Sequence, residues 1–133
     1  MKLSFRIKKQ ADFVYDYLTD MQKFASVHPL ISKIDEIGHQ KYLVHAYIRW
    51  GIIPVSFTYP VTIESYRAKN LILMQAVVMK LTKIEMVYVL SADDDFTVID
   101  ENITVKSPLP IKSIIERIFR KQHGLLFKNI EAL

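Results

Sequence analysis

Four polar side chains are predicted to point into an otherwise apolar interior: Tyr59, Tyr88, Glu101 and Gln122. A buried polar group without a partner costs on the order of 1–3 kcal/mol, so each of the four needs one. The requirement is strongest for Glu101, because an inward carboxylate is expensive to ionise. Three interpretations remain open for Glu101. It bonds a tyrosine hydroxyl or trapped water (or a bulge turns it to solvent), it anchors a ligand, or it acts as a general acid or base in a cavity.

The same predicted face carries large aromatic and sulfur-containing side chains. Such a set is typical of ordinary core. However, methionine is flexible, and a curved sheet around one helix seldom closes completely, so the set also fits the wall of an adaptable cavity. The predicted ligand-binding residues are Trp50, Phe57, Tyr59, Met74, Met86, Tyr88, Glu101, Ile118 and Gln122, and Glu101 is also the catalytic candidate.

The other residues that could do chemistry argue against metal, nucleotide and thiol sites. No histidine lies at a short ligand spacing from another, so all four are expected to be solvated or to cap an element: His28, His39, His45 and His123. Three glycines cannot form a phosphate loop, and the absence of cysteine excludes disulfide and thiol chemistry. The acidic run Asp93-Asp94-Asp95 lacks the spacing of a calcium loop. We therefore predict no metal and no cofactor.

Length and composition suggest one globular domain over residues 1–133. Half of the residues are hydrophobic and 24% are charged, which is the composition of a chain with a packed core. The net charge of +4 comes from scattered lysines and arginines, so no nucleic acid partner is predicted. No signal peptide and no membrane-spanning run is visible, so we expect a cytoplasmic protein without a transmembrane segment.

Apolar periodicity predicts the elements that would position these groups. Alternation over residues 2–8 indicates a strand, and a helical period follows from Ala11 to about Phe24. Turn signals divide residues 31–106 into six strands, and residues 107–110 break the last of them. Residues 111 to about 130 then have helical periodicity. Their predicted apolar stripe is Ile111, Ile114, Ile115, Ile118, Leu125 and Leu126, with Phe127 on the polar side.

The hairpins can be tested against one another, because a one-residue slip turns every side chain to the opposite face. The predicted pairs are Trp50 with Val55, Ile63 with Met74, Tyr88 with Ile99, and Met86 with Glu101. With these pairs, five strands independently place their apolar residues on one inner face. That agreement supports a single curved sheet.

The predicted order of strand, short helical pair, six-stranded meander and long C-terminal helix resembles the START-like or SRPBCC superfamily. Locally, residues 11–20 resemble that family's first helix, and residues 24–31 resemble the start of its second strand. The resemblance implies an α+β helix-grip fold of the birch-pollen-allergen type. In this fold a curved antiparallel seven-stranded sheet surrounds the C-terminal helix, and the short helical pair lies between the first and second strands. It also implies a hydrophobic cavity that takes lipids, sterols, hormones, quinones or polyketides.

The function predicted from these features is the binding or carriage of a small hydrophobic ligand that is lipid-, quinone- or polyketide-like. One alternative is a cyclase, aromatase or dehydratase type of enzyme that uses Glu101 and a tyrosine for proton transfer. A second is a protein-interaction module with a solid core. The expected partner is a small hydrophobic molecule, and the chain is expected to be a monomer or a weak homodimer.

Overall fold

The computed structural model describes the backbone of residues 1–133 and every side chain except that of Trp50. The elements are β1 (Lys2–Ile7), α1 (Ala11–Thr19), α2 (Met21–Val27), β2 (Ile31–Gly38), β3 (Lys41–Trp50), β4 (Ile53–Tyr66), the short 3-10 helix η1 (Arg67–Lys69), β5 (Leu71–Val78), β6 (Thr82–Asp93), β7 (Phe96–Lys106) and α3 (Lys112–Glu131). The strands form one antiparallel sheet in the order β1-β7-β6-β5-β4-β3-β2. The predicted helix-grip fold, with its helical pair between the first two strands, is therefore confirmed.

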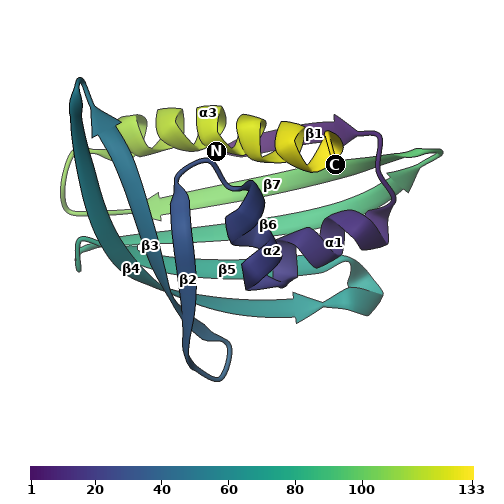
Figure 1. Cartoon of the computed structure of the whole chain (residues 1–133), viewed down its shortest axis with the longest axis horizontal. Coiled ribbons are helices and arrows are strands. Elements are labelled where there is room, and N and C mark those ends of the chain that lie inside the picture. The colour runs from purple at the N-terminus through teal and green to yellow at the C-terminus, as the bar shows by residue number, and fades with distance from the viewer.

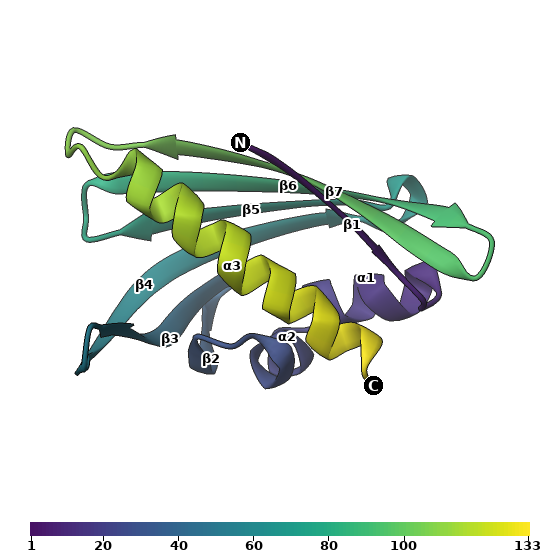
Figure 2. The ribbon, with the colours of Figure 1, turned by 90° about the horizontal axis from the view of Figure 1, so that it is seen from above.

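The curved sheet holds α3 against its concave face (Figures 1 and 2). Seen from above in Figure 2, α3 runs diagonally across the strands, and its C-terminal half lies beside the helical pair α1–α2. The Asn129 side chain ties these parts together, because its amide donates a 2.8 Å hydrogen bond to the Val27 carbonyl at the end of α2. The N-terminal half of α3 has no helix beside it, so the sheet alone faces it (Figure 2).

The predicted inner face of the sheet is confirmed, but two hairpin registers differ from the prediction. Trp50 lies opposite Ile53 instead of Val55, and Glu101 lies opposite Tyr88 instead of Met86. Both turns are two residues long, and the positive φ angles of Gly51 (66°) and Asp94 (55°) make such tight turns feasible. Each shift is an even number of residues, so every side chain stays on its predicted face.

The β4–β5 hairpin has the predicted pair of Ile63 with Met74. The connection is longer than the two-residue turn expected at Lys69 and Asn70. It consists of η1 followed by Asn70 in the left-handed conformation, with a φ of 49°. Asparagine is one of the few residues that accept this conformation at modest cost.

Two helices, α1 and α2, occupy the N-terminal helical region, and Asp20 separates them. Its carboxylate accepts hydrogen bonds from the backbone N–H groups of Gln22 (3.0 Å) and Lys23 (3.2 Å), which is the geometry of an N-cap. Asp20 thereby ends α1 and starts α2 along a new direction. The break points α2 toward the C-terminal half of α3 (Figure 2).

We expect Asp20→Ala to lower the free energy of unfolding by about 1 kcal/mol, because two N–H groups at the start of α2 lose their acceptor. Urea denaturation measures the change. Glu36→Ala is the matched control, since Glu36 is an exposed carboxylate on β2 that makes no side-chain hydrogen bond. Equal effects of the two substitutions would contradict a capping role for Asp20.

The buried face of α3 is rotated from the predicted stripe in its C-terminal half. Phe127, predicted on the polar side, is 1% exposed, and its ring centroid lies 4.6 Å from that of Phe5. Leu125, predicted in the stripe, is 39% exposed. The reason is that this half of α3 packs against β1 as well as β7, so a second apolar wall covers the flank that includes Phe127.

Candidate functional site

A cavity of about 510 Å³ lies between the concave face of the sheet and α3. Its wall comes from α2 and its linker to β2, from the strands β2 to β6, and from α3. The residues that line it are Met21, Phe24, His28, Leu30, Ile31, Ile34, Val44, Ala46, Ile48, Val55, Phe57, Tyr59, Val61, Ile63, Met74, Ala76, Val78, Met79, Ile84, Met86, Ile111, Ile114, Ile115, Ile118, Phe119, Gln122 and His123. The core is therefore hollow, which contradicts the alternative of an interaction module with a solid core.

The cavity has an apolar end and a polar end. Ile111, Ile114 and Ile115 line it from the first turns of α3, whereas Gln122 and His123 line it further along the same helix. At 1.5 Å per residue, Ile114 and His123 are about 13 Å apart along the helix axis. Among the described lining residues, the polar groups are His28, Tyr59, Gln122 and His123.

Exposed apolar side chains surround the apolar end. At the tip of the β3–β4 hairpin, Ile52 is 92% exposed and Ile53 is 62% exposed. In the turn between β5 and β6, Met79 and Leu81 are more than half exposed. Both turns lie at the same end of the sheet as the N-terminus of α3 (Figure 2). An apolar ligand approaching from this end would meet apolar side chains before it reached the interior.

Six of the nine predicted ligand-binding residues line the cavity: Phe57, Tyr59, Met74, Met86, Ile118 and Gln122. The side chain of Trp50 lies outside the described part of the chain. Tyr88 and Glu101 are buried, with 0% and 1% exposure, but they are absent from the cavity wall. A binding role for the predicted residues stays a prediction. The geometry does correct one detail of the enzyme alternative, because Glu101 does not reach the cavity directly.

Glu101 is paired with His123. Nδ1 of His123 lies 2.7 Å from both carboxylate oxygens, and its contact with Oε1 is a hydrogen bond, whereas Oε2 makes none. The Glu101 partner was expected to be a tyrosine hydroxyl or water, so this expectation is wrong. Because Glu101 lies behind His123, it orients the imidazole, and His123 is the group that faces the cavity.

Aromatic rings hold the His123 imidazole in place. The Phe119 ring meets it edge to face, with centroids 4.9 Å apart, and the Tyr88 ring stacks on it at 6.3 Å. Tyr88 responds electrostatically to the same carboxylate. Burial, followed by the negative charge of Glu101, raises the pKa of Tyr88 well above its usual value, so Tyr88 stays a neutral phenol. At the cavity wall, burial raises the pKa of Tyr59 to about 12.

His28 is the second histidine at the polar end, and α2 positions it. Its backbone N–H donates to the Phe24 carbonyl at 3.0 Å, which makes it the C-cap residue of the helix. Its side-chain Nδ1 accepts a 3.2 Å hydrogen bond from the Leu30 N–H. Burial, with a smaller contribution from the charge of His123, lowers the pKa of His28 to about 3. The ring is therefore neutral at physiological pH.

Sequence reasoning missed both histidines as cavity residues. The expectation of a solvated or capping role is wrong for His123, which is 1% exposed, and incomplete for His28, which both caps α2 and lines the cavity. A signal for His123 was present in the sequence. It lies four residues after Phe119 and four before Phe127, which is the spacing of one helical face.

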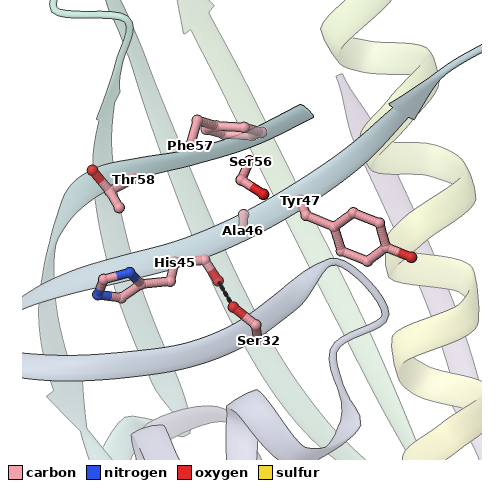
Figure 3. A pocket seen from close by; sticks show the side chains of 7 residues that line it. All are labelled: Ser32, His45, Ala46, Tyr47, Ser56, Phe57 and Thr58. Carbon is pink, nitrogen blue, oxygen red and sulfur yellow. Dashed lines mark hydrogen bonds between the residues drawn. The ribbon is translucent and has the colours of Figure 1, made fainter. Parts of the chain in front are cut away.

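A second hollow, of about 540 Å³, lies where β3 and β4 extend past the start of β2 (Figure 3). Its lining residues are Ser32, His45, Ala46, Tyr47, Ser56, Phe57 and Thr58. The Ser32 hydroxyl donates a 3.0 Å hydrogen bond to the His45 carbonyl, drawn as a dashed line in Figure 3. The His45 ring bonds the exposed Asp35 carboxylate at 2.8 Å, which lowers the pKa of Asp35. The polar groups of this hollow are thus occupied by one another or lie at the surface.

The described side chains contain no group of three or more histidine, aspartate or glutamate residues that could hold a metal ion. No helix in the described part of the chain is both long enough and apolar enough to cross a membrane.

Residues 4–131 match the family model for CoxG, a carbon monoxide dehydrogenase subunit. None of the curated proteins matches the sequence. Among solved structures, Ara h 8.0201 is 14% identical and has a TM-score of 0.79, covering 99% of this chain and 94% of that one. A START superfamily protein from Mycobacterium smegmatis is 15% identical, with a TM-score of 0.75 and coverages of 99% and 94%. The Zhui aromatase/cyclase from Streptomyces sp. R1128 is 12% identical, with a TM-score of 0.67 and coverages of 99% and 91%. At these identities the structures confirm the fold alone.

Proposed function

Because the chain belongs to the CoxG family, within the SRPBCC/START-like superfamily, we propose that it binds and carries a small hydrophobic ligand in the cavity between the sheet and α3. Residues 1–133 act in this proposal as one START-like domain. The ligand belongs to the lipid-, quinone- or polyketide-like molecules, whose common feature is a large apolar surface.

The observation that carries this proposal is the cavity itself. Its volume of about 510 Å³ falls within the range of roughly 300–1,000 Å³ that is usual for small-molecule sites. Its wall is almost entirely aliphatic, aromatic and methionine side chains, which supply affinity through the burial of apolar surface. The few polar groups are gathered toward one end, which favours a ligand with a long apolar body.

The structure gives more support to carriage than to the cyclase type of enzyme. That alternative assigned proton transfer to Glu101 and a tyrosine acting on the ligand. Of the two predicted inward tyrosines, Tyr59 lines the cavity and Tyr88 does not, and Glu101 is separated from the cavity by the His123 ring. A catalytic group must come within hydrogen-bond reach of the atom it acts on, and Glu101 does not meet that condition.

A native mass spectrum of the purified protein, compared with a denatured sample, tests carriage directly. We expect extra mass that is lost on denaturation, and its value gives the class of the bound molecule. An added apolar dye, N-phenyl-1-naphthylamine, should bind with enhanced fluorescence after the cavity has been emptied. A bare protein mass together with no dye binding would contradict the proposed function.

Filling the cavity should abolish dye binding. Ala76 lies on β5, is 3% exposed and lines the cavity, so Ala76→Phe puts a ring where the ligand would lie. We expect at least a tenfold weaker affinity for N-phenyl-1-naphthylamine in a fluorescence titration, with a far-ultraviolet circular dichroism spectrum like that of the wild type. Ala92→Phe, the same change at an exposed position on β6, is the control. Unchanged binding by Ala76→Phe would place the dye outside the cavity.

A further inference from the structure

Two imidazole rings converge at the polar end of the cavity. The centroids of His28 and His123 are 5.9 Å apart, and their planes are nearly perpendicular at 88°. One ring comes from the end of α2 and the other from α3, and the Asn129 bond to Val27 fixes these two helices against each other next to His28. The packing of α2 against α3 therefore positions the pair.

The hydrogen bond from Leu30 determines which His28 nitrogen carries the proton. Nδ1 accepts this bond, so it has no proton of its own. A neutral imidazole has one N–H, and here it must be on Nε2. No described protein group bonds to Nε2, and the ring lines the cavity. His28 therefore offers a neutral hydrogen-bond donor to whatever fills this end.

His123 completes the polar end with its own Nε2. Its Nδ1 is occupied by the Glu101 carboxylate at 2.7 Å, and no described group bonds to Nε2. The carboxylate fixes the orientation of the ring and offsets any positive charge on it. The pair of histidines consequently offers directed hydrogen bonds to a ligand without a net positive charge that would favour an anion.

We propose that His28 and His123 form a subsite for the oxygen-bearing end of the ligand, which is then an apolar molecule that ends in a carbonyl or hydroxyl oxygen. His28 donates the hydrogen bond from Nε2, His123 lies against the same end of the ligand, and Glu101 is a positioning residue that acts through His123. The inference rests on the proposed function, because it concerns the ligand of the same cavity. The low pKa of His28 agrees with it, since the donor stays neutral.

A matched pair of probes tests the subsite. 2-Acetylnaphthalene carries a ketone, and 2-isopropenylnaphthalene has nearly the same shape with a carbon in place of the oxygen. Both dissociation constants are measured by displacement of N-phenyl-1-naphthylamine. We expect the wild type to favour the ketone about five- to tenfold, the factor typical of one buried hydrogen bond. His28→Phe keeps the shape of the wall but removes the donor, so its preference should fall below twofold while it still binds the hydrocarbon.

His39→Phe is the matched control, because it makes the same change in an exposed residue of the β2–β3 turn and should keep the ketone preference. In long-range proton–nitrogen correlation spectra of the wild type, His28 should show the Nε2-protonated tautomer, and its Nε2 signal should shift when the ketone is added. A purely structural role for His28 predicts no such shift.

The possible failures can be told apart. If the wild type binds ketone and hydrocarbon equally, the subsite is wrong but the proposed function stands. The subsite is also wrong if the preference survives in His28→Phe and disappears in Tyr59→Phe, because Tyr59 would then be the donor. If the dye binds the wild type but neither probe displaces it, the subsite is wrong and the proposed function stands. If the native mass is bare and the dye does not bind either, the proposed function fails and the subsite fails with it.

Discussion

Replacing His123 with leucine is expected to lower the free energy of unfolding by about 3–5 kcal/mol, because it leaves the Glu101 carboxylate buried without a partner. Both side chains are 1% exposed, so water cannot replace the lost contact. The neighbouring Tyr88 ring stacks on His123, and its hydroxyl already donates to the Met86 sulfur at 3.7 Å. Urea denaturation at pH 7 measures the loss, which ranks with the largest effects expected from a single substitution.

The double variant His123→Leu/Glu101→Leu shows whether the unpaired charge is the cause. Replacing both partners of a buried polar pair with apolar residues is often close to neutral, so the double variant should be more stable than His123→Leu alone. A double-mutant cycle with Glu101→Leu gives the coupling energy. If the two single losses simply added in the double variant, the contact between His123 and Glu101 would contribute nothing specific to stability.

The sheet could be predicted because the face to which each side chain points stays the same when a turn is predicted two residues too long. The hairpins at Gly51 and Asp94 are tighter than expected, and each shifts its register by an even number of residues. Side chains alternate with a period of two, so such shifts change the neighbours of a residue but not its face. For that reason the prediction that Glu101 points inward is correct, although the residue opposite it on β6 is Tyr88 and not the predicted Met86.

The helix faces could not be predicted as well, because a helix can bury more than one flank. The first turns of α3 face the cavity, and Ile115 and Ile118 line it as expected. The last turns pack on β1 at the edge of the sheet, where Phe127 is buried against Phe5 and Leu125 is left at the surface. This additional wall depends on how the first and last strands pair, which is a long-range contact that local periodicity does not contain.

The polar end of the site was hard to predict for a different reason. Histidine occurs in many environments, and no short spacing links His28 with His123, which are far apart in the chain. Only the packing of α2 against α3 brings the two rings together. The inward position of Glu101 did imply a missing partner, and His123 lies on the same helical face as Phe119 and Phe127. Those two facts together would have pointed to the pair.

We also expect His28 to make stability depend strongly on pH. Burial lowers its pKa to about 3 in the folded protein, against 6.5 when it is exposed in the unfolded chain. Between these values the unfolded chain takes up a proton that the folded protein does not, so the stabilisation is fully present above pH 6.5 and is lost as the pH falls toward 3. Each pH unit removes about 1.4 kcal/mol, and the full effect amounts to roughly 4–5 kcal/mol.

The test compares the wild type with His28→Phe by urea denaturation at several values between pH 7 and pH 4.5. Other groups also titrate there, but their effects cancel in the difference between the two proteins, provided that they do not contact His28. The one neighbour that faces His28 electrostatically is His123, so the same series is repeated in the His123→Leu/Glu101→Leu background. We expect the wild type to lose about 2–3 kcal/mol relative to His28→Phe by pH 4.5. If the free energies of unfolding of the two proteins changed in parallel with pH, the His28 ring would accept a proton in the folded state. A charged ring at that position could not be the neutral donor that the cavity requires.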